Sequence, residues 1–239
     1  MPVERYFVEE PLQQGEQKWL LDTEFHHLAH VMRMRKGDEI ELVNGQGALA
    51  QATIAEIRKD RALLEVATLT VAQARTPLLV LAQAFPKLNR LDFILEKGTE
   101  LGVDEFWFFP GQQSIKKEIT DNQLERFQAL TIAAMKQCGR LFLPKVMVKP
   151  PIKKWTSLIG SAFFGDTEEG VPSFFQAWQQ ASLQSPVIFC VGPESGWSKE
   201  EIEMLKKMGA QGVKLHSNVL RTDTASLVAL SLIEHWLYT

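Results

Sequence analysis

From residue 78 onward, short apolar runs alternate with segments of helical spacing, and this alternation constrains the fold more than any other feature. Strand-like runs occupy 78–84, 103–109, 146–148, 162–164, 187–191 and 213–215. Helical spacing follows several of them, and the last helix is expected over 223–237. Strands that alternate with helices form a parallel or mostly parallel sheet covered by helices. Ligands of such sheets bind beyond the carboxyl ends of the strands.

Two turns follow strand-like runs in the second half of the sequence, and each opens a predicted helix. They read Val-Gly-Pro-Glu-Ser-Gly-Trp-Ser (191–198) and Leu-His-Ser-Asn-Val-Leu-Arg-Thr-Asp-Thr-Ala (215–225). Glycine permits close approach to the backbone, whereas Glu194 and the missing Gly-Lys-Ser/Thr disfavour a phosphate loop. Two such turns can form one ligand crevice, which indicates an enzyme. For the first turn, a purely structural role as a strand-to-helix connection is an equally good interpretation.

The first 74 residues have a different pattern, which predicts a small, partly closed β-barrel. Strands are expected over 5–8, 40–43, 49–57 and 62–71, with a short helix over 24–34. Asn44-Gly45 is a strong hairpin signal. The pattern changes near 74–77, so we expect two domains, 1–74 and 75–239.

Composition allows this arrangement and excludes several classes of protein. The chain has 239 residues, 45% of them apolar, which is enough for one large domain or two small ones. The net charge of −3 does not indicate nucleic acid, although residues 76–154 carry 12 Lys/Arg against 8 Asp/Glu and could line an anionic partner. An excess of basic residues of this size more often reflects ordinary surface charge than a binding site. Two cysteines without metal spacing predict a reduced, cytoplasmic protein, and no apolar run predicts a signal peptide or a membrane span.

The two turns and several upstream motifs together resemble one family. Gly-Pro-Glu-x-Gly-x-Ser, followed by Leu-x-x-x-Val-Leu-Arg-Thr-Asp-Thr-Ala, is similar to the SPOUT-class RNA methyltransferases. It is most similar to the bacterial enzymes that methylate N3 of a uridine in 16S ribosomal RNA. The likeness covers nearly the whole chain, with further motifs at 5–8, 26–28, 31–34, 36–39, 97–103 and 136–140.

The resemblance implies a fold, a cofactor and partners. Residues 1–74 would form a PUA-like RNA-binding β-barrel, and residues 75–239 a SPOUT α/β trefoil-knot domain that binds S-adenosylmethionine. The protein would be a cytoplasmic homodimer that acts on RNA of the small ribosomal subunit, with no membrane or metal partner. The implied cofactor-binding residues are Val191, Gly192, Pro193, Glu194, Gly196, Leu215, His216, Val219, Leu220, Thr222 and Thr224.

Methylation at uridine N3 requires loss of the N3 proton, so an enzyme can supply a base or stabilise negative charge on O2 and O4. Arg221 stays protonated and cannot be the base. We assign it to charge stabilisation or to holding the uracil, although capping of a helix or an ion pair are simpler uses of this turn. The candidate bases, left unranked, are Glu100, Glu194 and Asp223.

The candidate RNA-binding residues are basic side chains in or near the motifs: Arg5, Arg33, Arg35, Lys36, Lys116, Lys117 and Arg140. For Arg33, Arg35 and Lys36 a solvated surface is an even alternative. Arg140 could instead complement a helix dipole. His26 and His30 lack a third ligand, so a zinc site is not expected.

The chain departs from the family pattern at three positions. Ser195 and His216 stand where the family usually has glycine, and Gln113 stands where it usually has arginine. Ser195 is tolerable only if its φ is not positive. Two alternative functions remain: a methyltransferase of the same fold that acts on another base or position, and an RNA-binding factor that has lost its cofactor. A nicotinamide or nucleotide enzyme is disfavoured because Gly-x-Gly-x-x-Gly is absent.

Overall fold

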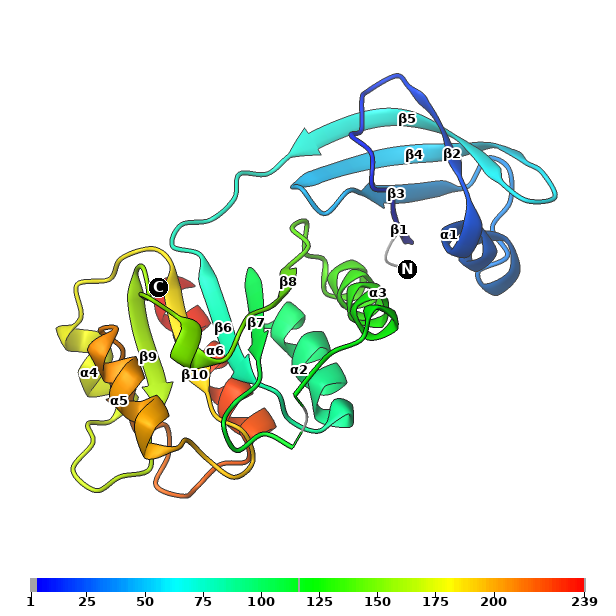
Figure 1. Ribbon diagram of the computed structural model, residues 1–239. Helices are drawn as coiled ribbons and strands as arrows, with labels where there is room; N and C mark the ends of the chain where they lie inside the picture. The colour runs from blue at the N-terminus through cyan, green and yellow to red at the C-terminus, as the bar shows by residue number, and fades with distance from the viewer. Residues whose placement is uncertain (1–3, 116, 239) are drawn as a thin grey trace. The chain divides into compact units, whose positions relative to one another are not determined.

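The computed structural model describes residues 4–115 and 117–238, and these form two compact units (Figure 1). Unit 1 comprises the described residues up to Ala74 together with Ile132–Leu143. Unit 2 comprises the other described residues, which are Arg75–Thr131, apart from residue 116, and the chain from Pro144 onward. The two units are therefore not simply consecutive in the sequence, because the end of one helix returns to unit 1.

Unit 1 is built on a curled sheet of five strands in the order β1-β3-β4-β5-β2. Neighbouring strands in this sheet are antiparallel, except for the parallel pair β1 and β3. In β4, buried and half-buried residues alternate, so one face supplies the core. The strands are β1 (Arg5–Phe7), β2 (Gln17–Leu20), β3 (Glu39–Val43), β4 (Ala48–Ile57) and β5 (Ala62–Val71).

The expected helix and hairpin of unit 1 are both present. The helix consists of α1 (Asp22–His26) followed by one π-helical turn, η1 (His27–Val31). The β3–β4 turn spans 44–47, where the side chain of Asn44 accepts hydrogen bonds from the amides of Gln46 and Ala48 at 2.9 and 3.2 Å. Strand β2 was not predicted, because its sequence Gln-Lys-Trp-Leu has no clear apolar alternation.

Unit 2 contains a fully parallel sheet of six strands in the order β11-β9-β10-β6-β7-β8. Every residue of the two central strands β6 and β10 is buried, as expected for strands covered on both faces. The strands are β6 (Leu79–Ala84), β7 (Glu105–Phe109), β8 (Lys145–Val148), β9 (Ser161–Gly165), β10 (Val187–Val191) and β11 (Gln211–Val213). The last strand begins two residues before the predicted 213–215.

Helices cover both faces of this sheet. On one face α2 and α6 pack together over Leu81 and Phe189, and on the other face Leu205 of α5 packs on Val80 and Cys190. The helical elements of the unit are α2 (Leu88–Glu100), α3 (Asp121–Cys138), η2 (Ile152–Lys154), α4 (Phe174–Gln180), α5 (Lys199–Lys207) and α6 (Thr222–Tyr238). Helix α4 lies in the region 149–184 that sequence patterns did not resolve.

Helix boundaries follow local capping chemistry. A capping box starts α5, since the Ser198 hydroxyl accepts from the Glu201 amide at 3.1 Å and the Glu201 carboxylate accepts from the Ser198 amide at 3.0 Å. Gly102, just beyond α2, has a φ of +86°, which is the left-handed conformation expected of a glycine after a helix end. These caps place the start of α5 directly beyond the carboxyl end of β10.

Candidate functional site

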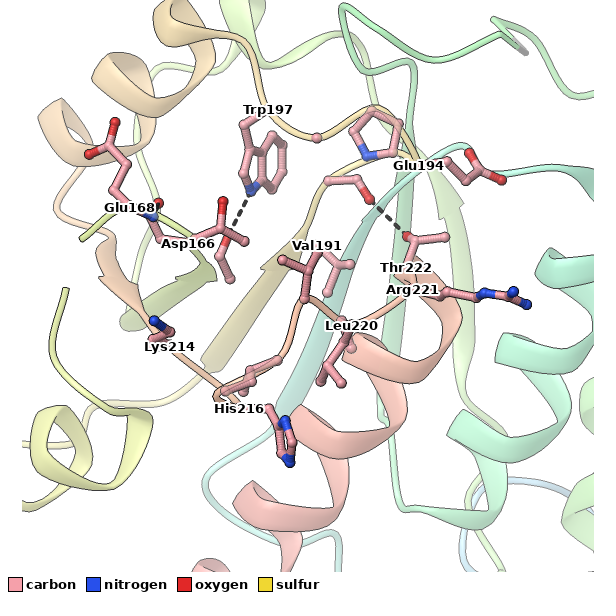
Figure 2. Close-up of a pocket in the computed structure, with 18 of the residues that line it drawn as sticks. Asp166, Glu168, Val191, Glu194, Trp197, Lys214, His216, Leu220, Arg221 and Thr222 are labelled. Atoms are coloured by element: carbon pink, nitrogen blue, oxygen red, sulfur yellow. Dashed lines mark hydrogen bonds between the residues drawn. The ribbon is translucent and has the colours of Figure 1, made fainter. Parts of the chain in front are cut away.

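A cavity of about 770 Å³ opens at the carboxyl ends of β9, β10 and β11 in unit 2 (Figure 2). Three loops line it, namely 165–168 after β9, 191–197 after β10 and 213–222 between β11 and α6. Its remaining lining residues are Arg90, Lys199, Ile202 and Ala225. The two turns singled out in the sequence therefore line one cavity at the sheet edge where ligands of parallel sheets bind.

The first turn is held closed by its own backbone and by an aromatic wall. Gly196 has a φ of +78°, and its amide donates to the Pro193 carbonyl at 2.9 Å. A side chain at Gly192 would come within 3.1 Å of the Trp197 ring, so glycine is required for this packing. The Trp197 indole N–H in turn donates to the Gly165 carbonyl at 3.0 Å, which ties the β9 loop to the first turn.

The two departures from the family pattern do not strain the backbone. Among the described residues other than glycine, only Asp22 and Arg33 have positive φ. Ser195 and His216 thus have conformations that any residue adopts. His216 also contributes to its turn, because its Nδ1 accepts from the Asn218 amide at 3.0 Å.

A buried polar network joins the two turns beneath the cavity. The Thr222 hydroxyl donates to the Gly192 carbonyl at 2.8 Å and accepts from the Gln83 side-chain amide at 2.9 Å. The Gln83 side chain also donates to the Ala84 carbonyl at 2.8 Å and accepts from the Ser226 hydroxyl at 2.6 Å. The side chains of Gln83, Thr222 and Ser226 are buried and paired, so the network fixes the start of α6 against the first turn. Gln83 is polar within an apolar strand, which was the only sequence signal for this role.

Arg90, near the start of α2, binds one carboxylate from each turn. Its Nη1 donates to Asp223 at 2.8 Å, and its Nε lies 3.6 Å from Glu194. Glu194 also accepts from the Lys87 amide at 3.0 Å. Two of the three candidate bases are therefore already paired with one guanidinium. Sequence spacing did not identify Arg90, because its partners are more than 100 residues away.

The structure brings Arg221 and Glu194 to the cavity but not Glu100. Arg221 is exposed on the lining, and within the described part of the chain its guanidinium has no hydrogen-bond or ion-pair partner. Glu100 lies at the far end of α2, about 20 Å along the helix axis from its start. It pairs with Lys97 at 2.7 Å, and the hydrogen bonds that this lysine donates to Glu100 and Glu96 raise its pKa.

Asp166 contributes a buried carboxylate to the lining of the cavity (Figure 2). It follows β9 directly, and only 6% of its surface is exposed. Its Oδ1 accepts from the Glu168 amide at 3.1 Å, whereas its Oδ2 has no partner among the described residues. A buried carboxylate of this kind had no motif to reveal it in the sequence.

All but one of the expected cofactor-binding residues line the cavity. Thr224 does not, since it lies exposed in the first turn of α6. The ten that do are Val191, Gly192, Pro193, Glu194, Gly196, Leu215, His216, Val219, Leu220 and Thr222.

The expected RNA-binding residues of unit 1 occupy different environments. Arg5 is largely committed to Glu41, with two hydrogen bonds of 2.9 and 2.6 Å. Arg33, Arg35 and Lys36 are exposed in the segment between η1 and β3. Arg140 is half-buried beyond the end of α3.

Of the two lysines expected to bind RNA from unit 2, one can be placed. Lys117 donates to the carbonyls of Gly111 and Gln112 at 2.7 and 3.0 Å, so its ammonium braces its own loop. Lys116 lies outside the described residues.

The described residues show neither a candidate metal site nor a helix that could span a membrane. No group of three or more His, Cys, Asp or Glu side chains suited to a metal ion occurs in the described ranges 4–115 and 117–238. Rings of His26 and His30 lie 4.9 Å apart, as an i, i+4 pair on one helix face. Within the same ranges, every helix is too short or too polar to span a membrane.

Residues 74–234 match the family model described as an RNA methyltransferase domain, and residues 20–67 match an RNA methyltransferase PUA domain. The chain belongs to the RNA methyltransferase family. The matched catalytic-domain model includes both turns, the β9 loop and Arg90, so the cavity lies within the part that defines the family.

Similar proteins agree over nearly the whole length. The ribosomal RNA small subunit methyltransferase E of Bacillus subtilis is 29% identical, covering 98% of this chain and 96% of its own. The Synechocystis protein of that name is 30% identical, over 90% and 71%. A crystal structure of the Neisseria gonorrhoeae enzyme of that name, bound to S-adenosyl methionine, matches with a TM-score of 0.86 and 27% identity over 98% of each chain. The expected fold class, a PUA-like domain followed by a SPOUT α/β domain, is confirmed.

The Thr222 network generates a stability prediction. Replacing Thr222 with valine keeps the volume but leaves the Gly192 carbonyl without its donor and one Gln83 N–H without its acceptor. We expect a loss of about 2 kcal/mol in the free energy of unfolding, measured by urea denaturation. The matched control is Thr224→Val, an exposed position two residues along the same helix, for which we expect a change below about 0.5 kcal/mol. Equal stability of the two variants would contradict the network's role.

Proposed function

We propose that this protein transfers a methyl group from S-adenosylmethionine to N3 of a uridine in the 16S ribosomal RNA of the small subunit. The observation that carries the proposal is the single cavity formed by the two motif turns, inside the matched RNA methyltransferase domain. The names of the Bacillus subtilis and Neisseria gonorrhoeae relatives, and the cofactor bound in the latter, support the same activity. The specific uridine and the N3 position come from the motif resemblance.

The lining of the cavity fits this cofactor chemically. Val191, Leu215 and Leu220 supply apolar surface, and the turns around them supply backbone amides and carbonyls. Asp166 adds a carboxylate with an unpaired oxygen, which suits the hydroxyl or ammonium groups of such a ligand. When bound, S-adenosylmethionine supplies an electrophilic methyl group on a sulfonium. The apolar groups and backbone dipoles of the two turns form no salt bridge that would be lost when that positive charge disappears on transfer.

We assign to Arg221 the stabilisation of the negative charge that develops on the uracil during the reaction. The N3 proton passes to solvent water, which places negative charge on O2 and O4 of the uracil until the methyl group bonds to N3. The planar guanidinium of Arg221 lines the cavity with its donors unpaired within the described residues, so it is available for these oxygens. Lysine has a single point charge and cannot reproduce two parallel hydrogen bonds.

Glu194 is assigned a positioning role instead of that of a general base. Protonation of Glu194 would weaken both its contact with Arg90 and its hydrogen bond from the Lys87 amide. The same argument applies to Asp223, which holds the other side of Arg90. Glu100 has no part in this proposal because it lies at the opposite end of α2.

The assignment of Arg221 predicts the effect of Arg221→Lys. We expect kcat for methylation of 16S ribosomal RNA to fall about 100-fold, because one bidentate contact to the developing charge is lost. The Kd for S-adenosylmethionine, measured by calorimetry, should change little. Arg126→Lys, at an exposed position on α3, serves as the matched control. Near-normal turnover by the Arg221 variant would remove the proposed role.

The assignment of Glu194 predicts the effect of Glu194→Gln. If Glu194 only positions Arg90 and the α2 terminus, kcat should fall less than about tenfold, and the pH profile of kcat should keep its shape. Steady-state rates measured across the pH range for this variant and for Glu200→Gln, an exposed carboxylate at the start of α5, provide the comparison. Loss of one limb of the profile together with a drop of about 100-fold or more would identify Glu194 as the base.

We also propose roles for the two domains, a cellular location and an oligomeric state. Residues 1–74 would serve as the RNA-binding PUA-like domain and 75–239 as the SPOUT methyltransferase domain. The RNA contacts would come from exposed basic residues such as Arg33, Arg35 and Lys36. The protein would act in the cytoplasm as a homodimer. Exposed apolar side chains on α2, Leu88 and Phe93, are 41% and 43% exposed and would suit a subunit interface.

The alternative hypothesis, an RNA-binding factor that has lost its cofactor, gains no support from the two turn residues that differ from the family pattern. Ser195 and His216 have φ values that do not require glycine, so neither residue distorts the cavity lining. Calorimetry with S-adenosylmethionine tests this directly, and methylation mapping of ribosomal RNA from cells that lack the protein tests the substrate. Loss of one methyluridine, restored by the wild-type gene, is the expected result. An unchanged RNA modification pattern would contradict the proposed function.

A further inference from the structure

Within residues 4–74, most of the basic residues are concentrated at one end of the sheet. Residues 4–74 contain eight Lys or Arg, and six of them fall in two short segments, 33–36 and 58–61. The other two are committed to acids, since Arg5 pairs with Glu41 and Lys18 lies 3.2 Å from Glu10. Residues 4–74 carry twelve Asp or Glu, so this concentration is not a consequence of a basic composition.

Strand register brings the two segments together. Glu39 at the start of β3 is opposite Thr53 near the end of β4, so residues 33–38 and the β4–β5 turn lie at the same end. The Gly37 amide, directly after the first segment, donates to the Ile54 carbonyl at 2.8 Å, which fixes that segment to β4, the strand that leads into the second segment. Lys36 and Arg61 are both close enough to Glu56 to lower its pKa, after the larger effect of the Arg58 hydrogen bond.

Trp19 organises the arginines of the β4–β5 turn. Trp19 on β2 pairs with Leu63 on β5, which places its ring beside the turn. The guanidinium carbons of Arg58 and Arg61 lie 4.8 and 4.7 Å from the centre of this ring. Stacking of a guanidinium on an indole occupies its face but leaves its N–H edge available. The ring thus holds two flexible cations in place before any partner binds.

The edges of these arginines are only partly used within the protein. The Nε and Nη2 of Arg58 donate to Glu56 at 2.9 and 3.1 Å, and Nη1 takes no part in this pairing with the carboxylate. The Arg61 Nε is buried without a hydrogen-bond partner among the described residues and lies 3.9 Å from Asp60 Oδ1, so the donors that Arg61 offers to a ligand are those on its Nη atoms. Lys59, at the tip of the turn, is exposed. The side chains of Arg58 and Arg61 are 46% and 40% exposed, so their remaining donors can reach a ligand.

We propose that Arg58, Lys59 and Arg61, ordered on Trp19 and flanked by Lys36, form a docking surface for the phosphate backbone of RNA. Donors held in fixed positions suit successive phosphates, and such contacts give affinity without reading sequence. The surface lies outside the cavity and extends the basic segment 33–36 across a second strand connection. It rests on the proposed function only in taking RNA as the partner.

The test removes the charges and measures the salt dependence of binding. Arg58→Gln, Lys59→Gln and Arg61→Gln are combined, and binding of transcribed 16S ribosomal RNA is titrated on filters across a series of KCl concentrations. We expect the slope of log affinity against log salt to become shallower by about 2, with affinity at low salt reduced about tenfold or more. The matched control combines Lys145→Gln, Lys206→Gln and Lys207→Gln, which removes the same charge from exposed positions of unit 2.

The outcomes separate this inference from its alternatives. A slope and affinity equal to those of the wild type, or equal losses in the control triple, would overturn the docking surface. Thermal unfolding and binding of S-adenosylmethionine check that the triple variant is folded. Lys59→Glu, a single change at an exposed turn, provides a second variant that the fold tolerates and should weaken binding in the same direction. Wild-type protein that binds RNA at this surface but leaves ribosomal RNA unmethylated would refute the proposed function and retain this inference.

Discussion

The site depends on the hydrogen bond that the carbonyl of Gly192 accepts. This bond joins the half-buried start of the first turn to the buried side chain of Thr222, where an unpaired polar group would be costly. Thr222 supplies the donor, and Gln83 in turn supplies a donor to Thr222. A residue from the central strand, one from the first turn and one from the last helix are thereby locked together. The shape of the cavity follows from this arrangement, because both of its principal walls are attached to the same network.

A second constraint is electrostatic and acts on the rim of the cavity. Arg90 pairs with both Glu194 and Asp223, one from each turn, so each carboxylate already has a cationic partner. Arg221 is left without an acidic partner among the described residues, although it stands two residues from Asp223. The pairing of Arg90 therefore accounts for the availability of Arg221. This division of charge is the physical basis for assigning transition-state stabilisation to one arginine and positioning to the other.

Local patterns predicted the elements whose residues carry a clear period or cap. The apolar runs of β6 and β10, the Asn44-Gly45 hairpin and the Ser198 capping box all occur where the sequence places them. Strand β2 and helix α4 were not predicted, since their burial comes from packing on distant elements. In α4, for example, Phe174 contacts Phe189 and Trp236 through ring packing that no local spacing indicates.

By itself, the sequence determined the α/β class, the two-part organisation and the two turns at strand ends, because these follow from short-range periodicity and from motifs. Only the tertiary structure decided which charged groups face one another. Glu100 and Glu194 have the same chemistry, yet α2 carries Glu100 away from the cavity while the first turn holds Glu194 beside Arg90. Likewise, Lys36 and Arg61 become neighbours only through the register of β3 on β4. Charge interactions act through space at a few ångströms, so separations of 25 or 100 residues conceal them until the chain is folded.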